Sequence, residues 1–164
     1  MELVLAHHDA GLEQLAAAEP RALRPLLGRL WDEDRSRRRM VARALAAGAA
    51  AHPELGAEIV RRLLWALNDE AGTNGVYGVA ALGEIGARCP DLMEPFVGPL
   101  ASWARDDGLR PEILRALARI GGSAPRLVQP HLEDIRRLVD PGDPEEARLL
   151  ADVERITEEA TETR

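Results

Sequence analysis

The sequence predicts an all-α fold, a right-handed α-solenoid of about four helical hairpins preceded by a short N-terminal capping helix. Three observations support this prediction. Four prolines recur at intervals of 33, 37 and 35 residues: Pro20, Pro53, Pro90 and Pro125. About fifteen residues with helical apolar spacing follow each proline. A second, alanine-rich apolar stretch completes each interval, and a period of this size is typical of helical-pair repeats.

The first helix of each hairpin is predicted from columns of apolar residues. When the four stretches are aligned on their prolines, one column contains Leu30, Leu63, Leu100 and Ile135. The apolar positions of each stretch are spaced i, i+4, i+5 and i+8, which forms one stripe of a helix. Proline suits the start of such a helix because its missing N–H would have no intrahelical partner there. We therefore expect each first helix to bury this stripe.

The second helix of each hairpin follows a polar turn. The turns are rich in residues that cap helices and form turns, chiefly Asp, Asn and Gly. Small residues in the second helices, such as Gly83 and Ala116, allow neighbouring helices to approach closely. The whole chain, 1–164, is predicted to be one domain. Its expected parts are a capping helix (9–18), four repeats (approximately 21–53, 54–90, 91–125 and 126–159) and a frayed polar tail (160–164).

The composition excludes several classes of protein. All 21 basic residues are arginine, and without lysine the chain has no Walker-type phosphate loop, Schiff-base lysine or lysine general base. The single cysteine, Cys89, forms neither an internal disulfide nor a cysteine-rich zinc site, which suits a reducing compartment. The N-terminal residues lack the basic region and long apolar run of a signal peptide or membrane span. We therefore predict a cytoplasmic protein.

The net charge of −7 is unevenly distributed along the chain. Residues 138–164 carry 9 acidic residues and 3 arginines, and so supply most of the excess. An acidic chain repels a phosphate backbone unless its basic residues gather on one face. Nucleic-acid binding is therefore disfavoured.

The segment 63–86 reads LLWALNDEAGTNGVYGVAALGEIG and carries the most specific motif. With the repeat period, the early prolines and the acidic turns, it resembles bacterial HEAT-like repeats of the phycobilisome-lyase type over about residues 21–157. The segment is also similar to a group of HEAT-like proteins from sulfate-reducing and related bacteria. Val79 and Ala80 stand where that group has a proline-glutamate pair, and Tyr77 stands one residue late for its aromatic. The matching residues are Leu67, Asn68, Asp69, Glu70, Gly72, Gly75, Gly83, Glu84 and Ile85. The resemblance implies a fold and no particular activity.

Arginines are densest at the start of the first repeat's second helix. The candidate partner-binding residues there are Arg35, Arg38, Arg39 and Arg43. The first three share one helix face, so they are suited to hold carboxylates or phosphates with forked hydrogen bonds. The resemblance places second helices on the concave side of the repeat array. The alternative is a solvated, self-paired face, in which Asp34 caps the helix and pairs with Arg38 while Asp32 and Glu33 neutralise the remaining charge.

Other candidate residues lie in turns and near helix ends. We include Asn68, Asp69, Glu70, Asn74, Tyr77 and Arg110 among the partner-binding candidates. The polar turn before Gly75 is interpreted either as a functional loop or as a capping turn. The three tryptophans, Trp31, Trp65 and Trp103, are interpreted either as an exposed aromatic platform or as core residues at repeat junctions.

No residues predict catalysis or a resident metal. The pair His7 and His8 lacks further ligands nearby, and Cys89 is expected to behave as a small buried apolar residue. We therefore expect no cofactor and predict a non-catalytic scaffold or adaptor that binds an unidentified partner protein along a curved helical surface. The alternatives are a bilin-lyase-like or other ligand-handling protein and a HEAT-like nucleic-acid-binding protein. We expect a monomer or weak homodimer that does not bind membranes.

Overall fold

The computed structural model describes residues 2–68 and 75–162, with side chains described from residue 10 onward. Within these residues the secondary structure is entirely helical, joined by turns and short loops. The predicted all-α class is therefore confirmed. No helix in the described part of the chain is both long and apolar enough to cross a membrane.

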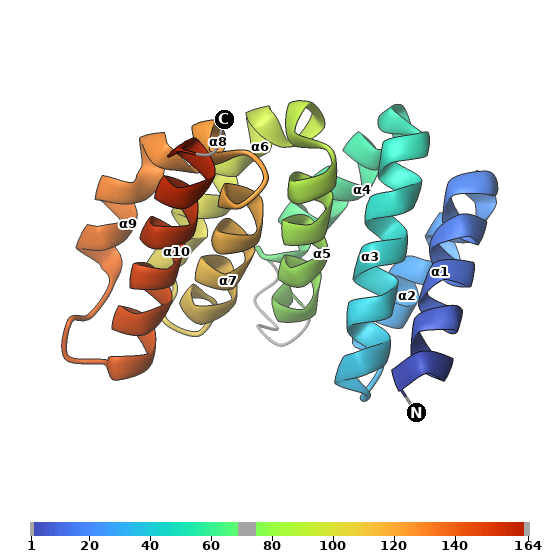
Figure 1. The fold of residues 1–164 in the computed structure, drawn as a ribbon, viewed down its shortest axis with the longest axis horizontal. Coiled ribbons are helices and arrows are strands. Elements are labelled where there is room, and N and C mark those ends of the chain that lie inside the picture. Colours follow the sequence, from blue (N-terminus) through green and yellow to red (C-terminus); the bar gives the residue numbers. More distant parts are fainter. Residues whose placement is uncertain (1, 69–74, 163–164) are drawn as a thin grey trace.

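Alternate helices along the chain form one row. Its members pack side by side in chain order (Figure 1). They are α1 (Glu2–Ala18), α3 (Arg35–Ala51), α5 (Gly75–Arg88), α7 (Arg110–Gly121) and α10 (Pro144–Glu162). We call this the inner row.

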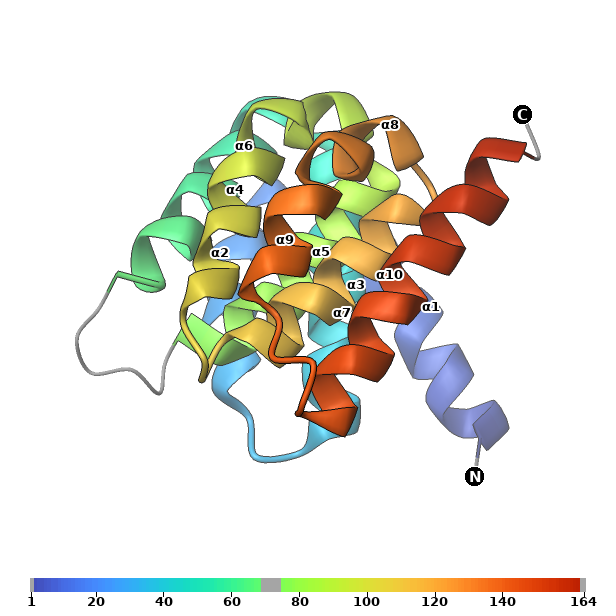
Figure 2. The same cartoon turned by 90° about the vertical axis from the view of Figure 1, so that its left-hand side faces the viewer.

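The remaining helices form an outer row on one side of the inner row, as Figure 2 shows. Its members are η1 (Pro20–Ala22), α2 (Leu23–Gly28) and η2 (Arg29–Trp31); α4 (Pro53–Ala66); α6 (Pro90–Ser102) and η3 (Trp103–Arg105); and α8 (Pro125–Val128), η4 (Gln129–His131) and α9 (Leu132–Leu138). Each group begins at one of the four recurring prolines. Proline is tolerated there because the first residues of a helix donate no intrahelical hydrogen bond.

The hydrophobic core lies between the two rows. The column formed by Leu30, Leu63, Leu100 and Ile135 is buried throughout, and each of these side chains is at most 2% exposed. Inner-row residues such as Leu82 complete the same core cluster. Burial of an apolar stripe from each outer helix therefore holds the rows together, as the apolar spacing predicts.

The N-terminal helix is longer than predicted. It covers Glu2–Ala18 rather than 9–18. The predicted first residue of this helix is therefore wrong, and the helix is not short. Residues 2–10 contain neither glycine nor proline and include good helix formers such as leucine and alanine. The predicted start depended on the repeat pattern, which does not extend into these residues.

Helices α5 and α7 approach closely where Gly83 faces Ala116. A Cβ atom on residue 83 would lie 3.0 Å from the Ala116 Cα atom, which is closer than nearly all Cβ contacts in proteins. The prediction that small residues permit close approach is correct here. Because neither residue projects a large side chain, the surface over this crossing remains open.

Candidate binding groove

A groove of about 750 Å³ crosses the exposed side of α3, α5 and α7. We call it the arginine groove, because six arginines line it: Arg35, Arg38, Arg39, Arg43, Arg115 and Arg119. Small or apolar residues line it between them: Ala42, Val76, Ala80, Gly83 and Ala116. Tyr77 and two glutamates, Glu84 and Glu112, complete it.

The four predicted arginines of α3 all line this groove. Arg115 and Arg119 of α7 were missed as site residues, although the sequence contained a signal for the first. The motif RALAAG, which starts at Arg43, aligns with RALARIG, which starts at Arg115. Equivalent positions of the repeats lie on the same face of the array, so Arg115 in the third repeat lines the groove as Arg43 does in the first.

Asp34 caps helix α3 as predicted. Its carboxylate accepts hydrogen bonds from the Ser36 backbone N–H at 2.7 Å and the Ser36 hydroxyl at 2.6 Å. These bonds, the hydroxyl bond first, hold the pKa of Asp34 below its ordinary value of 3.8. The predicted pairing of Asp34 with Arg38 is wrong. Instead, the Arg37 side chain points back over the turn before the helix. Its Nε lies 3.8 Å from Asp34 Oδ2, and its Nη1 lies 3.6 Å from Asp32 Oδ2.

Arg38 joins the start of α3 to α5. Its guanidinium Nη1 donates to the backbone carbonyls of Asp32, at 2.6 Å, and Glu33, at 3.0 Å. The same guanidinium lies over the ring of Tyr77, 4.4 Å from its centroid, in a cation–π contact. Arg38 and Tyr77, both predicted as partner-binding residues, are therefore in contact and hold each other in place.

The two ends of the arginine groove differ in how their charges are balanced. Arg43 pairs with Glu13 at 3.1 Å, and Arg119 pairs with Glu84 at 3.1 Å. Arg115 likewise pairs with Glu112 and Glu145. Arg35 and Arg39 are exposed and form no ion pair with any residue that the structure describes. Among the residues that the structure describes, the start of α3 therefore carries positive charge that no ion pair compensates.

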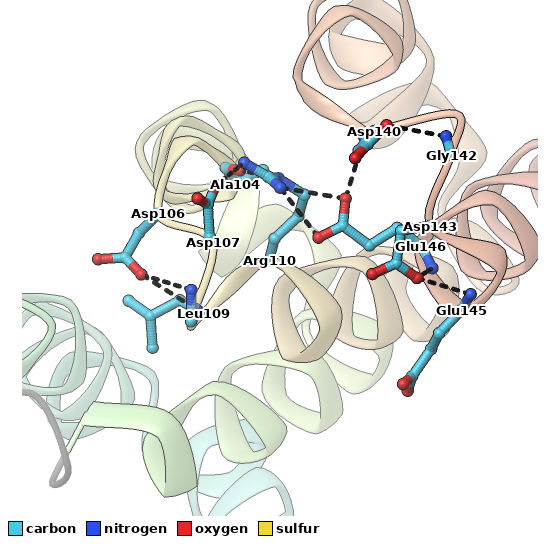
Figure 3. Close-up of polar contacts among 11 residues, drawn as sticks. Ala104, Asp106, Asp107, Leu109, Arg110, Asp140, Gly142, Asp143, Glu145 and Glu146 are labelled. Atoms are coloured by element: carbon cyan, nitrogen blue, oxygen red, sulfur yellow. Dashed lines mark hydrogen bonds and ion pairs between the residues drawn. The ribbon is translucent and has the colours of Figure 1, made fainter.

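Arg110, which was predicted to bind a partner, is buried, with only 7% exposed, and its donors are used within the fold. Figure 3 shows it enclosed between the η3–α7 turn and the start of α10. Nη1 donates to both oxygens of Glu146, at 2.9 and 3.0 Å, and Nε donates to the Ala104 carbonyl at 2.6 Å. Nη2 donates to Asp107. Burial opposes the charged form, but the hydrogen bonds that Arg110 donates to Glu146 and Asp107 outweigh this effect and raise the pKa of Arg110.

The three tryptophans do not share one environment. Trp65 is 73% exposed and Trp31 is 39% exposed, whereas Trp103 is half-buried against the core. Neither interpretation, a common platform or a common core position, therefore applies to all three. The three residues occupy different positions: Trp31 ends η2, Trp65 lies in the last turn of α4 and Trp103 begins η3.

The polar turn after α4 is described only in part. Asn68 is exposed, and its backbone N–H donates to the Trp65 carbonyl. The other predicted residues of this turn, Asp69, Glu70 and Asn74, lie outside the described residues.

Cys89 lies half-buried at the start of α6, and its Sγ is 3.9 Å from the Ala46 carbonyl. Burial raises the pKa of its thiol, with a smaller opposing effect of Arg88. The thiol is therefore protonated and weakly nucleophilic near neutral pH. Across the described residues no three His, Cys, Asp or Glu side chains gather as metal ligands would. The side chains of His7 and His8 are not among those described.

No protein-family model matches the chain, and no curated protein or solved structure is significantly similar to it.

Proposed function

We propose that the protein is a non-catalytic interaction scaffold that binds an elongated segment of a partner protein in the arginine groove. The observation that carries this proposal is the groove of about 750 Å³, in which arginines from two helices border a floor of small residues. Such a surface offers both charge and apolar contact, as protein-binding surfaces rich in arginine do. It contains no cluster that suggests a reaction.

The arrangement of the rows supports a right-handed α-solenoid of HEAT-like hairpins as the framework. Inner-row and outer-row helices alternate along the chain, and each inner helix packs mainly on its two neighbours. Repeat arrays of this kind present extended surfaces that suit elongated partners. The repeats proposed here are those expected from the prolines, 21–53, 54–90, 91–125 and 126–159.

The dimensions of the groove suit a short stretch of peptide. Packed helices lie about 8–10 Å apart, so the distance across the groove from α3 to α7 is roughly 16–20 Å. An extended chain advances about 3.3 Å per residue, so about five or six residues would span this distance. The groove is therefore long enough to recognise a sequence rather than a single side chain.

The test is affinity purification from the source organism with three forms of the protein. The first is the wild type, and the second is Ala80→Trp, which fills the groove floor at an exposed position of α5. The third is the matched control Arg61→Trp, at an exposed position of α4 in the outer row. Circular dichroism establishes that all three are folded. We expect one specific partner on the wild type and the control, cross-linked through α3 or α5, and its loss from Ala80→Trp.

Equal retention of that partner by folded Ala80→Trp would contradict the proposal, and so would its loss from the Arg61→Trp control. A cross-link that maps to the outer row would contradict it as well, because the proposal assigns binding to the inner row.

Nucleic-acid recognition is a second candidate, favoured by the same six arginines. Glu84 and Glu112 in the groove and the net charge of −7 oppose it. Binding of a DNA duplex that weakens steeply with salt, and that is lost when Arg35, Arg38, Arg39 and Arg43 are replaced by glutamate, would support this candidate.

A further inference from the structure

We infer that the segment bound in the arginine groove is acidic, and that its carboxylates are held by Arg35 and Arg39. This inference rests on the proposed function and adds the chemistry of the partner.

Beyond its Asp34 cap, α3 has first-turn charges that differ from those of four other helices. The helix dipole makes negative charge favourable near an N-terminus and positive charge unfavourable. Acidic residues accordingly occupy the first turns of α4, α6, α7 and α10: Glu54, Asp91, Glu112 and Glu145 with Glu146. The first turn of α3 contains no acidic residue, and arginines occupy its first two turns.

Two of these arginines have no compensation within the described part of the fold. Arg37 lies near two aspartates, and Arg38 is bonded to backbone carbonyls. Arg35 and Arg39 are exposed one turn apart, a spacing at which like charges destabilise a helix. The free protein is therefore less stable because of them, and a bound anion would remove this penalty.

The composition of the groove selects an acidic peptide over a nucleic acid. The small and apolar residues between the arginines, such as Val76 and Ala80, would pack against apolar side chains of a peptide. A continuous phosphate backbone would instead meet Glu84 and Glu112. It would also meet the field of an acidic protein, whereas a short peptide responds mainly to charges within about 8–10 Å.

In this inference the arginines of α3 have different roles. Arg35 and Arg39 present guanidinium forks that match carboxylates with paired hydrogen bonds. Arg38 is a positioning residue, because its bonds to Asp32 and Glu33 and its contact with Tyr77 fix the surface that the peptide approaches.

The experiment measures binding and stability in the same variants. The probe is a fluorescein-labelled peptide of about ten residues that alternates glutamate with leucine or alanine, compared with the same peptide carrying glutamine. A single-stranded oligonucleotide of the same length is the third probe. The variant is Arg35→Gln with Arg39→Gln, which removes charge at nearly constant helix propensity. The matched control, Arg61→Gln with Arg62→Gln, removes the same charge from exposed positions of the outer row.

We expect the wild type and the control to bind the glutamate peptide at low salt and the glutamine peptide far more weakly. Loss of Arg35 and Arg39 should reduce the affinity by about tenfold for each arginine. The same substitutions should raise the Tm of the free protein by about 1–4 °C, which loss of structure would not do.

Absence of binding by the wild type, equal binding by the variant, equal loss in the control, or tighter binding of the oligonucleotide would each overturn the inference. Its failure is distinguishable from that of the proposed function. If Ala80→Trp loses the cellular partner while the double glutamine variant retains it, the groove binds a partner that is not recognised through Arg35 and Arg39.

Discussion

Arginine side chains have opposite surroundings at the start of α7 and at the start of α3. Arg110 is enclosed by carboxylates and a carbonyl from two segments, so its charge is used within the fold. Arg35 and Arg39 face a groove where the described fold provides no carboxylate for them. An arginine's role therefore depends on whether packing brings an acid to it. Under the proposed function, the arginines without an ion pair among the described residues are the ones available to a partner.

The largest effect is expected from breaking the buried pair at α7. Glu146→Leu should lower the free energy of unfolding by about 3–5 kcal/mol, because Arg110 would remain buried without its main counter-ion. Replacing both residues, with Arg110→Met added, should recover much of the loss. Urea denaturation followed by circular dichroism measures both effects.

The exposed pair formed by Arg119 and Glu84 is the control for this prediction. Glu84→Gln should change the free energy of unfolding by at most about 1 kcal/mol, because solvent screens the pair. If Glu146→Leu lowered the free energy of unfolding no more than Glu84→Gln does, the buried pair would contribute no more to stability than the exposed pair, and the prediction would be wrong.

A smaller effect is expected at Arg38, which shares α3 with the unmatched arginines but has partners of its own. Arg38→Ala should cost about 1–2 kcal/mol, through loss of two carbonyl hydrogen bonds and the contact with Tyr77. Arg35→Ala should change stability by no more than about 0.5 kcal/mol in the same urea titration. Equal costs at the two positions would mean that Arg38 does not anchor the groove.

The smallest effect on stability should come from introducing a carboxylate near the arginines at the start of α3. Ala80→Glu places an acid on the groove floor near its arginines, and should stabilise the free protein by about 0.2–1 kcal/mol at low salt. The uncharged control is Ala80→Gln. Thermal denaturation at low and high salt should show a difference between the two that shrinks as salt is added. A constant difference would indicate packing rather than charge.

The helices were predictable because their signals are local. The prolines and the column containing Leu30 and Leu63 reflect hydrogen bonding and burial within single helices, and both agree with the structure. The α3 half of the arginine groove was predictable for the same reason, since Arg35, Arg38 and Arg39 share one helix face.

The surroundings of individual side chains were not predictable, because they depend on a neighbouring repeat. Arg110 is buried by Glu146, 36 residues later in the chain. Arg115 and Arg119 reach the groove only because α7 packs beside α5, which Gly83 permits. No pattern within one helix contains that information.

The packing of each inner helix mainly on its neighbours also has a consequence for local unfolding. In such an array the ends have the fewest contacts, so α1 should open more readily than the middle of the molecule. Glu13 of α1 bonds to both Arg43 and Arg88. Each opening of α1 would therefore take the Glu13 carboxylate away from Arg43 and Arg88, so fluctuations at one terminus would alter the charge beside the groove.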